Sequence, residues 1–178
     1  LPDDEPLEFW NGYGGFAPGG REYVIRFAAG DAGGVTRPPQ PWVNVLANEQ
    51  FGALVSETGA GTTWSVNSRE HRLTPWSNDP LVDPHGEALY LRDADTGALA
   101  SPLPGPAAGT GACETRHGFG ITRFRRNLPG LSCASEVFVP RADALKIVRV
   151  SVTNVGAAPR RLTIAAYQLI VLGALPEE

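Results

Sequence analysis

Hydrophobic and polar residues alternate with a period of two along most apolar segments of this chain. Near the N-terminus, Tyr23, Ile25 and Phe27 would share one face of an extended segment, with Val24 and Arg26 on the other. Successive side chains of a β-strand point to opposite faces, so this spacing predicts half-buried strands of an antiparallel sheet. The pattern is repeated with one face formed by Val148, Val150 and Val152, and again by Leu162, Ile164 and Ala166.

Turn residues separate the predicted strands. The Asn-Leu-Pro-Gly stretch at 127–130 predicts that residues 121–139 form a hairpin. Residues 93–97 predict a second hairpin turn, in which Gly97 suits a positive φ, and residues 154–156 begin a third.

The composition agrees with a fold of many short strands. The chain has 178 residues, enough for one domain with its own core. Gly (21) and Pro (16) make up about a fifth of it, which indicates many turns without reaching the level typical of disorder. The Gly/Pro-rich segments 30–41 and 101–111 are expected to be long loops. Without a long helix, these features predict an all-β antiparallel sandwich or barrel.

Charge and motif spacing exclude several function classes. The net charge is −4 and the basic residues are scattered, so nucleic acid is not an expected partner. The sequence has neither the phosphate-binding Gly-rich loop nor the Gly-x-Ser-x-Gly nucleophile motif, and no cofactor is expected. His71, His85 and His117 lack metal-ligand spacing and are interpreted as structural histidines. Cys113 and Cys133 are interpreted as small buried hydrophobic residues, not as a disulfide framework.

The C-terminal apolar run is not a membrane span. It covers residues 162–175, contains Tyr167 and Gln168, and is too short to cross a bilayer, so direct membrane insertion by this chain is not expected. The Pro-Glu-Glu at 176–178 is typical of the start of a linker. We therefore expect one β-domain at 1–172 and the start of a linker at 173–178.

The densest polar and aromatic stretch lies between residues 57 and 79. Sugars are bound by planar donors and acceptors that pair with hydroxyls, and by aromatic faces that pack against the C–H-rich face of the ring. This stretch supplies both. Its candidate substrate-binding residues are Trp64, Asn67, Arg69, Glu70, Arg72, Trp76, Asn78 and Asp79. The alternative is a polar loop tied to itself through Arg69–Glu70 and Arg72–Asp79, with its tryptophans anchored in the core.

Seven segments, in order along nearly the whole chain, carry a resemblance to a known family. They are 11–16 (NGYGGF), 20–24 (GREYV), 41–45 (PWVNV), 67–80 (NSREHRLTPWSNDP), 86–93 (GEALYLRD), 116–120 (RHGFG) and 137–140 (VFVP). Together they resemble the first domain of inverting glycoside phosphorylases, the family that includes cellobiose and chitobiose phosphorylases. The version at 67–80 is most similar to the phosphorylase-like region of cyclic β-1,2-glucan synthases.

The resemblance implies a two-sheet antiparallel super-sandwich, similar to galactose-mutarotase-like domains. In the family, a helical linker and an (α/α)-barrel follow, and the barrel contains the catalytic general acid and most of the phosphate site. No catalytic residue is therefore assigned to this chain, which alone is expected to be inactive. For the larger enzyme, the resemblance implies a β-glucan oligosaccharide and inorganic phosphate as substrates. It also implies the barrel of the same or a neighbouring chain as partner, and a cytoplasmic location, possibly within an inner-membrane protein.

Three functions stay open at this point. The first is a non-catalytic domain that shapes the sugar site or a domain interface of a phosphorylase or glucan synthase. The second is an autonomous carbohydrate-binding module, and the third is a structural interaction domain without ligand contact. Binding of the isolated chain to glucans separates the second from the first, because an autonomous module binds unaided.

Overall fold

The computed structural model describes residues 5–27, 36–77, 79, 81–107, 109 and 111–173. Within them the chain forms twelve β-strands and no helix, and therefore no helix that is long and apolar enough to cross a membrane. The strands are β1 (Gly14–Phe16), β2 (Glu22–Phe27), β3 (Val43–Ala47), β4 (Phe51–Ser56), β5 (Gly61–Ser65), β6 (Glu87–Asp93), β7 (Leu99–Ala100), β8 (Cys113–Gly118), β9 (Ile121–Leu128), β10 (Leu131–Phe138), β11 (Ile147–Asn154) and β12 (Leu162–Gln168).

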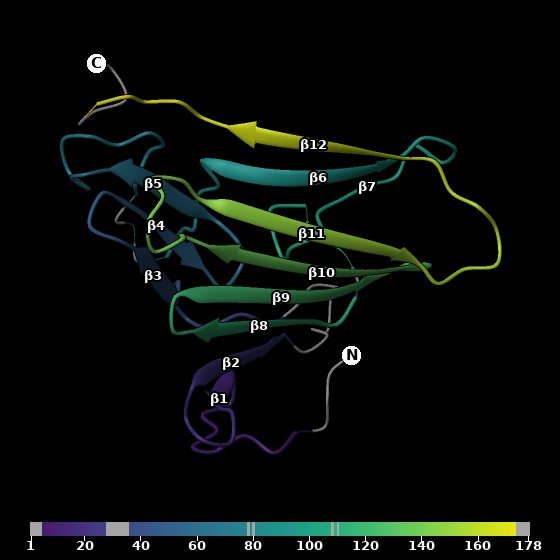
Figure 1. Cartoon of the computed structure of the whole chain (residues 1–178). Helices are drawn as coiled ribbons and strands as arrows, with labels where there is room; N and C mark the ends of the chain where they lie inside the picture. The colour runs from purple at the N-terminus through teal and green to yellow at the C-terminus, as the bar shows by residue number, and fades with distance from the viewer. Residues whose placement is uncertain are drawn as a thin grey trace.

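Six strands form one antiparallel sheet in the order β1-β2-β8-β9-β10-β11 (Figure 1). The predicted hairpin at 121–139 is confirmed as β9 and β10, which pair from Ile121↔Phe138 to Leu128↔Leu131. The predicted turn at 93–97 is also confirmed. It joins β6 to β7, and Gly97 has a φ of +74°, which glycine adopts without steric cost.

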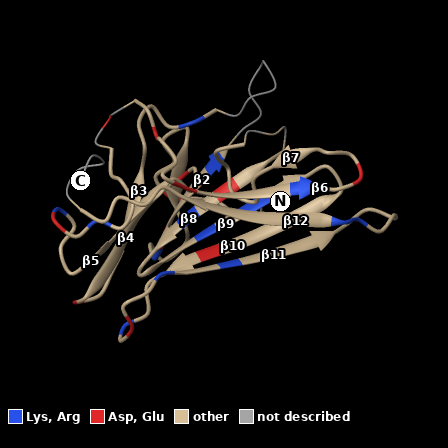
Figure 2. Cartoon of the chain, turned by 90° about the horizontal axis from the view of Figure 1, so that it is seen from above, with Lys and Arg blue, Asp and Glu red and all other residues tan. Residues whose placement is uncertain are grey.

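The other two sheets, β3-β4-β5 and β12-β6-β7, form the second layer of the sandwich (Figures 1 and 2). Isolated bridges connect them, because the backbone of Arg72 pairs with Trp64 on β5 and also with Gly173, which follows β12. The predicted antiparallel two-sheet super-sandwich is therefore confirmed, with its second layer divided into two short sheets.

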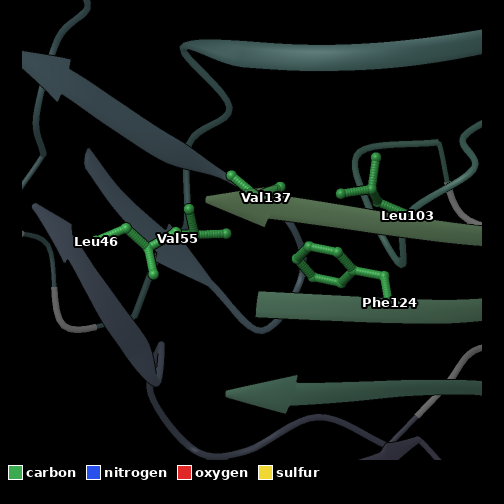
Figure 3. Packing of buried hydrophobic residues seen from close by; sticks show 5 residues of the cluster. All are labelled: Leu46, Val55, Leu103, Phe124 and Val137. Carbon is green, nitrogen blue, oxygen red and sulfur yellow. The ribbon is translucent and has the colours of Figure 1, made fainter. Parts of the chain in front are cut away.

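Both short sheets pack against the same face of the six-stranded sheet. One hydrophobic cluster joins β3 and β4 to β9 and β10, and it consists of Leu46, Val55, Leu103, Phe124 and Val137 (Figure 3). A second cluster joins β6 to β9 and β10, and it consists of Leu91, Leu128, Leu131 and Cys133. Burial of this apolar area holds the two layers together.

A buried arginine lies between the two cysteines on the core face of the large sheet. Cys113 and Cys133 are the cross-strand partners of Arg126 on β8 and β10. Both thiols are free and buried, as predicted, and burial raises their pKa values. Arg126 is 1% exposed, and its Nη1 donates to carbonyl oxygens of residues 101–107. These bonds hold the predicted 101–111 loop, which has no strand among its described residues, against the sheet.

Two expectations for the C-terminal strands are wrong. Residues 154–156 do not begin a hairpin, because β12 crosses to the other layer and pairs with β6, placing Ile164 opposite Leu91. β12 is also not half-buried. Leu162 packs against the second core cluster, whereas Ile164 is 57% exposed and Ala166 is exposed as well. A period of two predicted the strand correctly, but it carries no information on which strand is the partner or how deeply a face is covered.

Candidate functional site

The predicted sugar-binding residues lie on the 64–79 segment, which begins on the edge strand β5 and leads toward β6. Trp64 is half-buried, and its indole covers Gly52 on the neighbouring strand β4, where an added Cβ would overlap the ring. The ring fills the space that the glycine leaves on the sheet surface. Trp64 therefore holds β5 against β4 and has a structural role at this position.

A tight turn follows, and Val66 is its strained residue. Val66 has a φ of +61°, which is costly for a β-branched side chain, and its amide donates to Gln50 O at 2.7 Å. Asn67 closes the turn with its side chain, because Oδ1 accepts hydrogen bonds from the amides of Arg69 and Glu70 at 2.8 and 3.0 Å. The predicted residue Asn67 therefore orders the turn.

Arg69 and Glu70 lie at the exposed tip of this turn. Arg69 Nε and Glu70 Oε1 are 3.2 Å apart, and the two side chains are 85% and 56% exposed. An exposed ion pair contributes little stability, so both side chains remain available for other hydrogen bonds. Arg72 is more firmly placed: it is half-buried, and its Nε donates to Ser68 O at 3.1 Å.

A buried polar cluster anchors the segment beyond the turn. Thr74 is 3% exposed; its hydroxyl donates to Glu87 Oε1 at 2.7 Å and accepts from Thr63 N at 2.8 Å. Lys146, the only lysine of the chain, forms an ion pair with Glu87 and donates to Thr63 Oγ1 at 2.7 Å. Burial favours a raised pKa for Glu87, but the ion pair and the two threonine hydroxyls outweigh it and lower the pKa. Glu87 is therefore ionised at neutral pH, and its hydrogen bond with Thr74 fixes this part of the 64–79 segment.

Trp76 and Asp79 lie at the outer end of the segment. Trp76 is 37% exposed and lines a pocket of about 20 Å³ against β3 and β4, so it is not the core anchor that the alternative interpretation required. Asp79 Oδ1 accepts from the amides of Leu81 and Val82 at 2.8 and 2.9 Å, and these bonds lower its pKa. Asn78 lies outside the described residues.

The cavities next to the segment are too small for a sugar. A cavity of about 70 Å³ lies between the layers, with Glu87 and Lys146 among its lining residues, and the pocket beside Trp76 is smaller still. Small-molecule sites usually have volumes of about 300–1,000 Å³. The 64–79 segment therefore presents its polar groups on an open surface, where a second surface is needed to enclose a ligand.

Two ionisable side chains share the backbone of Trp42. Glu57 Oε2 accepts from Trp42 N at 2.8 Å, and His117 Nε2 lies 3.1 Å from Trp42 O. Burial raises the pKa of Glu57 to about 7 and lowers the pKa of His117 to about 4. His117 is thus a structural histidine, as predicted. His85 is half-buried with Nδ1 3.1 Å from Asp83 O, whereas His71 is exposed.

In the described part of the chain, no group of three or more His, Cys, Asp or Glu side chains is placed to hold a metal ion. The buried polar cluster of Thr63, Thr74, Glu87 and Lys146 was missed by the sequence analysis. Thr63 and Lys146 are separated by 83 positions, so no local spacing connects them. The one available signal was that the lone lysine of an Arg-rich chain directly precedes a predicted strand.

Comparison with known proteins agrees with this architecture. The model of the family "Glycosyl hydrolase 94, supersandwich domain" matches residues 21–178. The chain is 44% identical over 172 residues to the cyclic beta-(1,2)-glucan synthase NdvB of Rhizobium meliloti (strain 1021), covering 96% of this chain and 6% of that protein. It is 30% identical to the N,N'-diacetylchitobiose phosphorylase of Vibrio furnissii, covering 87% of this chain and 19% of that enzyme.

A third relative is a phosphorylase that is named for a different sugar. The 3-O-beta-D-glucopyranosyl-beta-D-glucuronide phosphorylase of Paenibacillus borealis is 35% identical over 153 residues, which cover 85% of this chain and 18% of that enzyme. The chain thus spans less than a fifth of the length of each of these three relatives. The match with the family model extends over most of the chain and includes eleven complete strands, from β2 to β12. This chain belongs to the glycosyl hydrolase 94 supersandwich domain family.

Proposed function

We propose that this chain is a non-catalytic domain that forms part of the sugar site of an enzyme acting on β-glucans, either a glycoside phosphorylase or a cyclic β-1,2-glucan synthase. One observation carries the proposal. The 64–79 segment holds Arg69 and Glu70 on an ordered turn, yet leaves both side chains exposed and weakly paired. A turn fixed at its base with free donors and acceptors at its tip suits the hydroxyls of a sugar.

The chemistry that this role supports is phosphorolysis by the longer protein. Inorganic phosphate attacks the anomeric carbon while a carboxylic acid protonates the leaving oxygen. An inverting hydrolase needs a second carboxylate to activate water, but phosphate is already anionic and needs no such base. In this proposal the acid and the phosphate site belong to an (α/α)-barrel outside this chain, and the domain works in the cytoplasm. The 64–79 segment would cover one side of the bound glucan.

Arg69→Ala in the full-length protein tests the proposal. We expect KM for the β-glucan substrate to rise several-fold, because a hydrogen-bonding side chain to the sugar is lost, while the midpoint of thermal unfolding is unchanged. Arg161→Ala is the matched control. Arg161 is 78% exposed and pairs with Asp95, so it repeats the exposed Arg–acid pair on the far side of the domain.

The kinetic and binding results distinguish the three candidate functions. If Arg69→Ala and Arg161→Ala both leave KM and kcat at wild-type levels, the segment has no role in substrate binding, and a structural interaction domain explains the chain better. If the isolated chain binds glucans and loses that binding with Arg69→Ala, the autonomous carbohydrate-binding module is the better description. The half-exposed Trp76 is the observation that favours this second candidate.

A further inference from the structure

A polar groove lies on the six-stranded sheet, and none of its lining residues belongs to the 64–79 segment. It has a volume of about 420 Å³, within the range of small-molecule sites, and it runs from Glu5 and Arg21 to the tip of the β8–β9 hairpin. Phe119 forms that tip and is 86% exposed. On the other side of the same tip, Gly120 lines a second groove of about 480 Å³, so the hairpin is a ridge between two hollows.

The charges in the first groove are paired with one another. Arg116 Nη1 is 3.0 Å from Glu5 and 3.4 Å from Glu22, and Arg116 Nε is 2.7 Å from Glu114. Arg123 continues the row, with Nη1 2.6 Å from Glu22 Oε1. The row continues across the outer face of the sheet, where Arg123 on β9 pairs with Glu136 on β10, and Glu136 pairs with Arg149 on β11 (Figure 2).

This pairing of charges indicates which class of ligand the groove can bind. Arg21, Arg116 and Arg123 line the groove, and the last two are paired with the carboxylates of Glu5, Glu22, Glu114 and Glu136. A groove in which two of the three arginines are already paired with carboxylates has reduced affinity for phosphate or another anion. It offers instead planar donors beside carboxylate acceptors, and a sugar hydroxyl is both a donor and an acceptor.

Phe119 supplies the second requirement of a sugar site. An exposed aromatic ring costs free energy in water unless a ligand covers it, and its face packs well against the C–H-rich face of a pyranose ring. Its position on the ridge places the ring above the polar row rather than within the core. The flanking residues Gly118 and Gly120 keep the hairpin tip clear of other side chains.

We propose that the β8–β9 ridge is a second carbohydrate-binding site, at which a neutral oligosaccharide crosses Phe119 and hydrogen-bonds to Arg123 and Glu22. The chemistry of the groove gives the class, a neutral polyhydroxylated chain. The choice of β-linked glucose rests on the proposed function. The site is separate from the 64–79 segment and needs no catalytic barrel, so it serves to hold a glucan chain on the domain while its end is processed elsewhere.

The test uses the ¹⁵N-labelled chain and a β-1,2-linked glucopentaose, followed by NMR titration. We expect saturable shifts of the Gly118, Phe119 and Gly120 amides, and at least about a tenfold weaker affinity in Phe119→Ala, equivalent to one lost stacking contact. Leu99→Ala is the control, because Leu99 is 57% exposed on β7 in the other layer. It is expected to bind as the wild type does.

Three results would overturn the proposal: no saturable shift at the hairpin, equal affinities in Phe119→Ala and the wild type, or the same amides responding to inorganic phosphate alone. The last would show an anion site. None of these results alters KM in the Arg69→Ala enzyme, so failure here is distinguishable from failure of the proposed function.

Discussion

Replacing Lys146 with Met is expected to lower the free energy of unfolding of the chain by about 3 kcal/mol at pH 7. The side chains of Lys146 and Glu87 are only 10% and 13% exposed, and the substitution leaves the Glu87 carboxylate buried beside Thr63 and Thr74 without a cation. Urea unfolding at pH 7 measures the loss. In the double variant with Glu87→Met, the loss should be smaller than the sum of the two single losses, because no unpaired charge remains.

The pH dependence gives an independent check. In the wild type the pKa of Glu87 is depressed, so its contribution to stability is complete above the unfolded value and is lost as pH falls through the folded value. Without Lys146, burial raises that pKa instead, and the deficit of the variant should shrink as pH falls toward 4.5. A loss below about 0.5 kcal/mol that does not vary with pH would show that the pair behaves as a surface salt bridge and does not anchor the segment.

Replacing Glu57 with Gln is expected to stabilise the chain by about 2–3 kcal/mol at pH 8.5 and to have almost no effect at pH 4.5. The pKa of Glu57 is raised from its ordinary value of 4.5 to about 7. Between these values the folded state retains a proton that the unfolded state has lost, so stability falls as pH rises and then stays level above 7. Glutamine avoids the buried charge and still offers an acceptor to Trp42 N.

Because His117 also contributes to the pH dependence of stability, the free energy of unfolding of Glu57→Gln must be compared with that of the wild type at each pH. Its pKa is lowered from 6.5 to about 4, so its contribution falls as pH drops through this range, opposite in sign to that of Glu57. The two contributions partly cancel in the wild type, whereas the difference between Glu57→Gln and the wild type isolates Glu57. Equal differences in the free energy of unfolding at pH 4.5 and pH 8.5 would mean that Glu57 titrates normally.

Local patterns predicted strands such as β9 and β10 because each of these has one face on a core. The hairpin at 121–139 was predicted correctly, since its turn chemistry and its partner strand are both local in sequence. β12 shows what local patterns cannot predict. Its alternation is clear, but its partner β6 ends 69 positions before it begins, and pairing across that separation depends on the packing of both layers.

In the candidate site, too, features that depend on local sequence were predicted and features that depend on distant contacts were not. Composition identified the 64–79 segment, and the side chain of Asn67 orders its turn as a short polar residue often does. Composition did not show that Trp64 covers Gly52, because that contact depends on strand register. It also did not predict that Arg126, within an alternating strand, points into the core, where carbonyl oxygens of the 101–107 loop accept its hydrogen bonds.

The most direct test of the proposed sugar site is hydrogen–deuterium exchange of the full-length protein with and without a β-1,2-linked glucopentaose. We expect slower exchange of the amides at residues 66–77 when the sugar is bound, because the ordered turn would then be covered by the glucan. Unchanged exchange of these amides, measured while the sugar is bound and protects other peptides of the protein, would contradict the claim that this domain forms part of the sugar site.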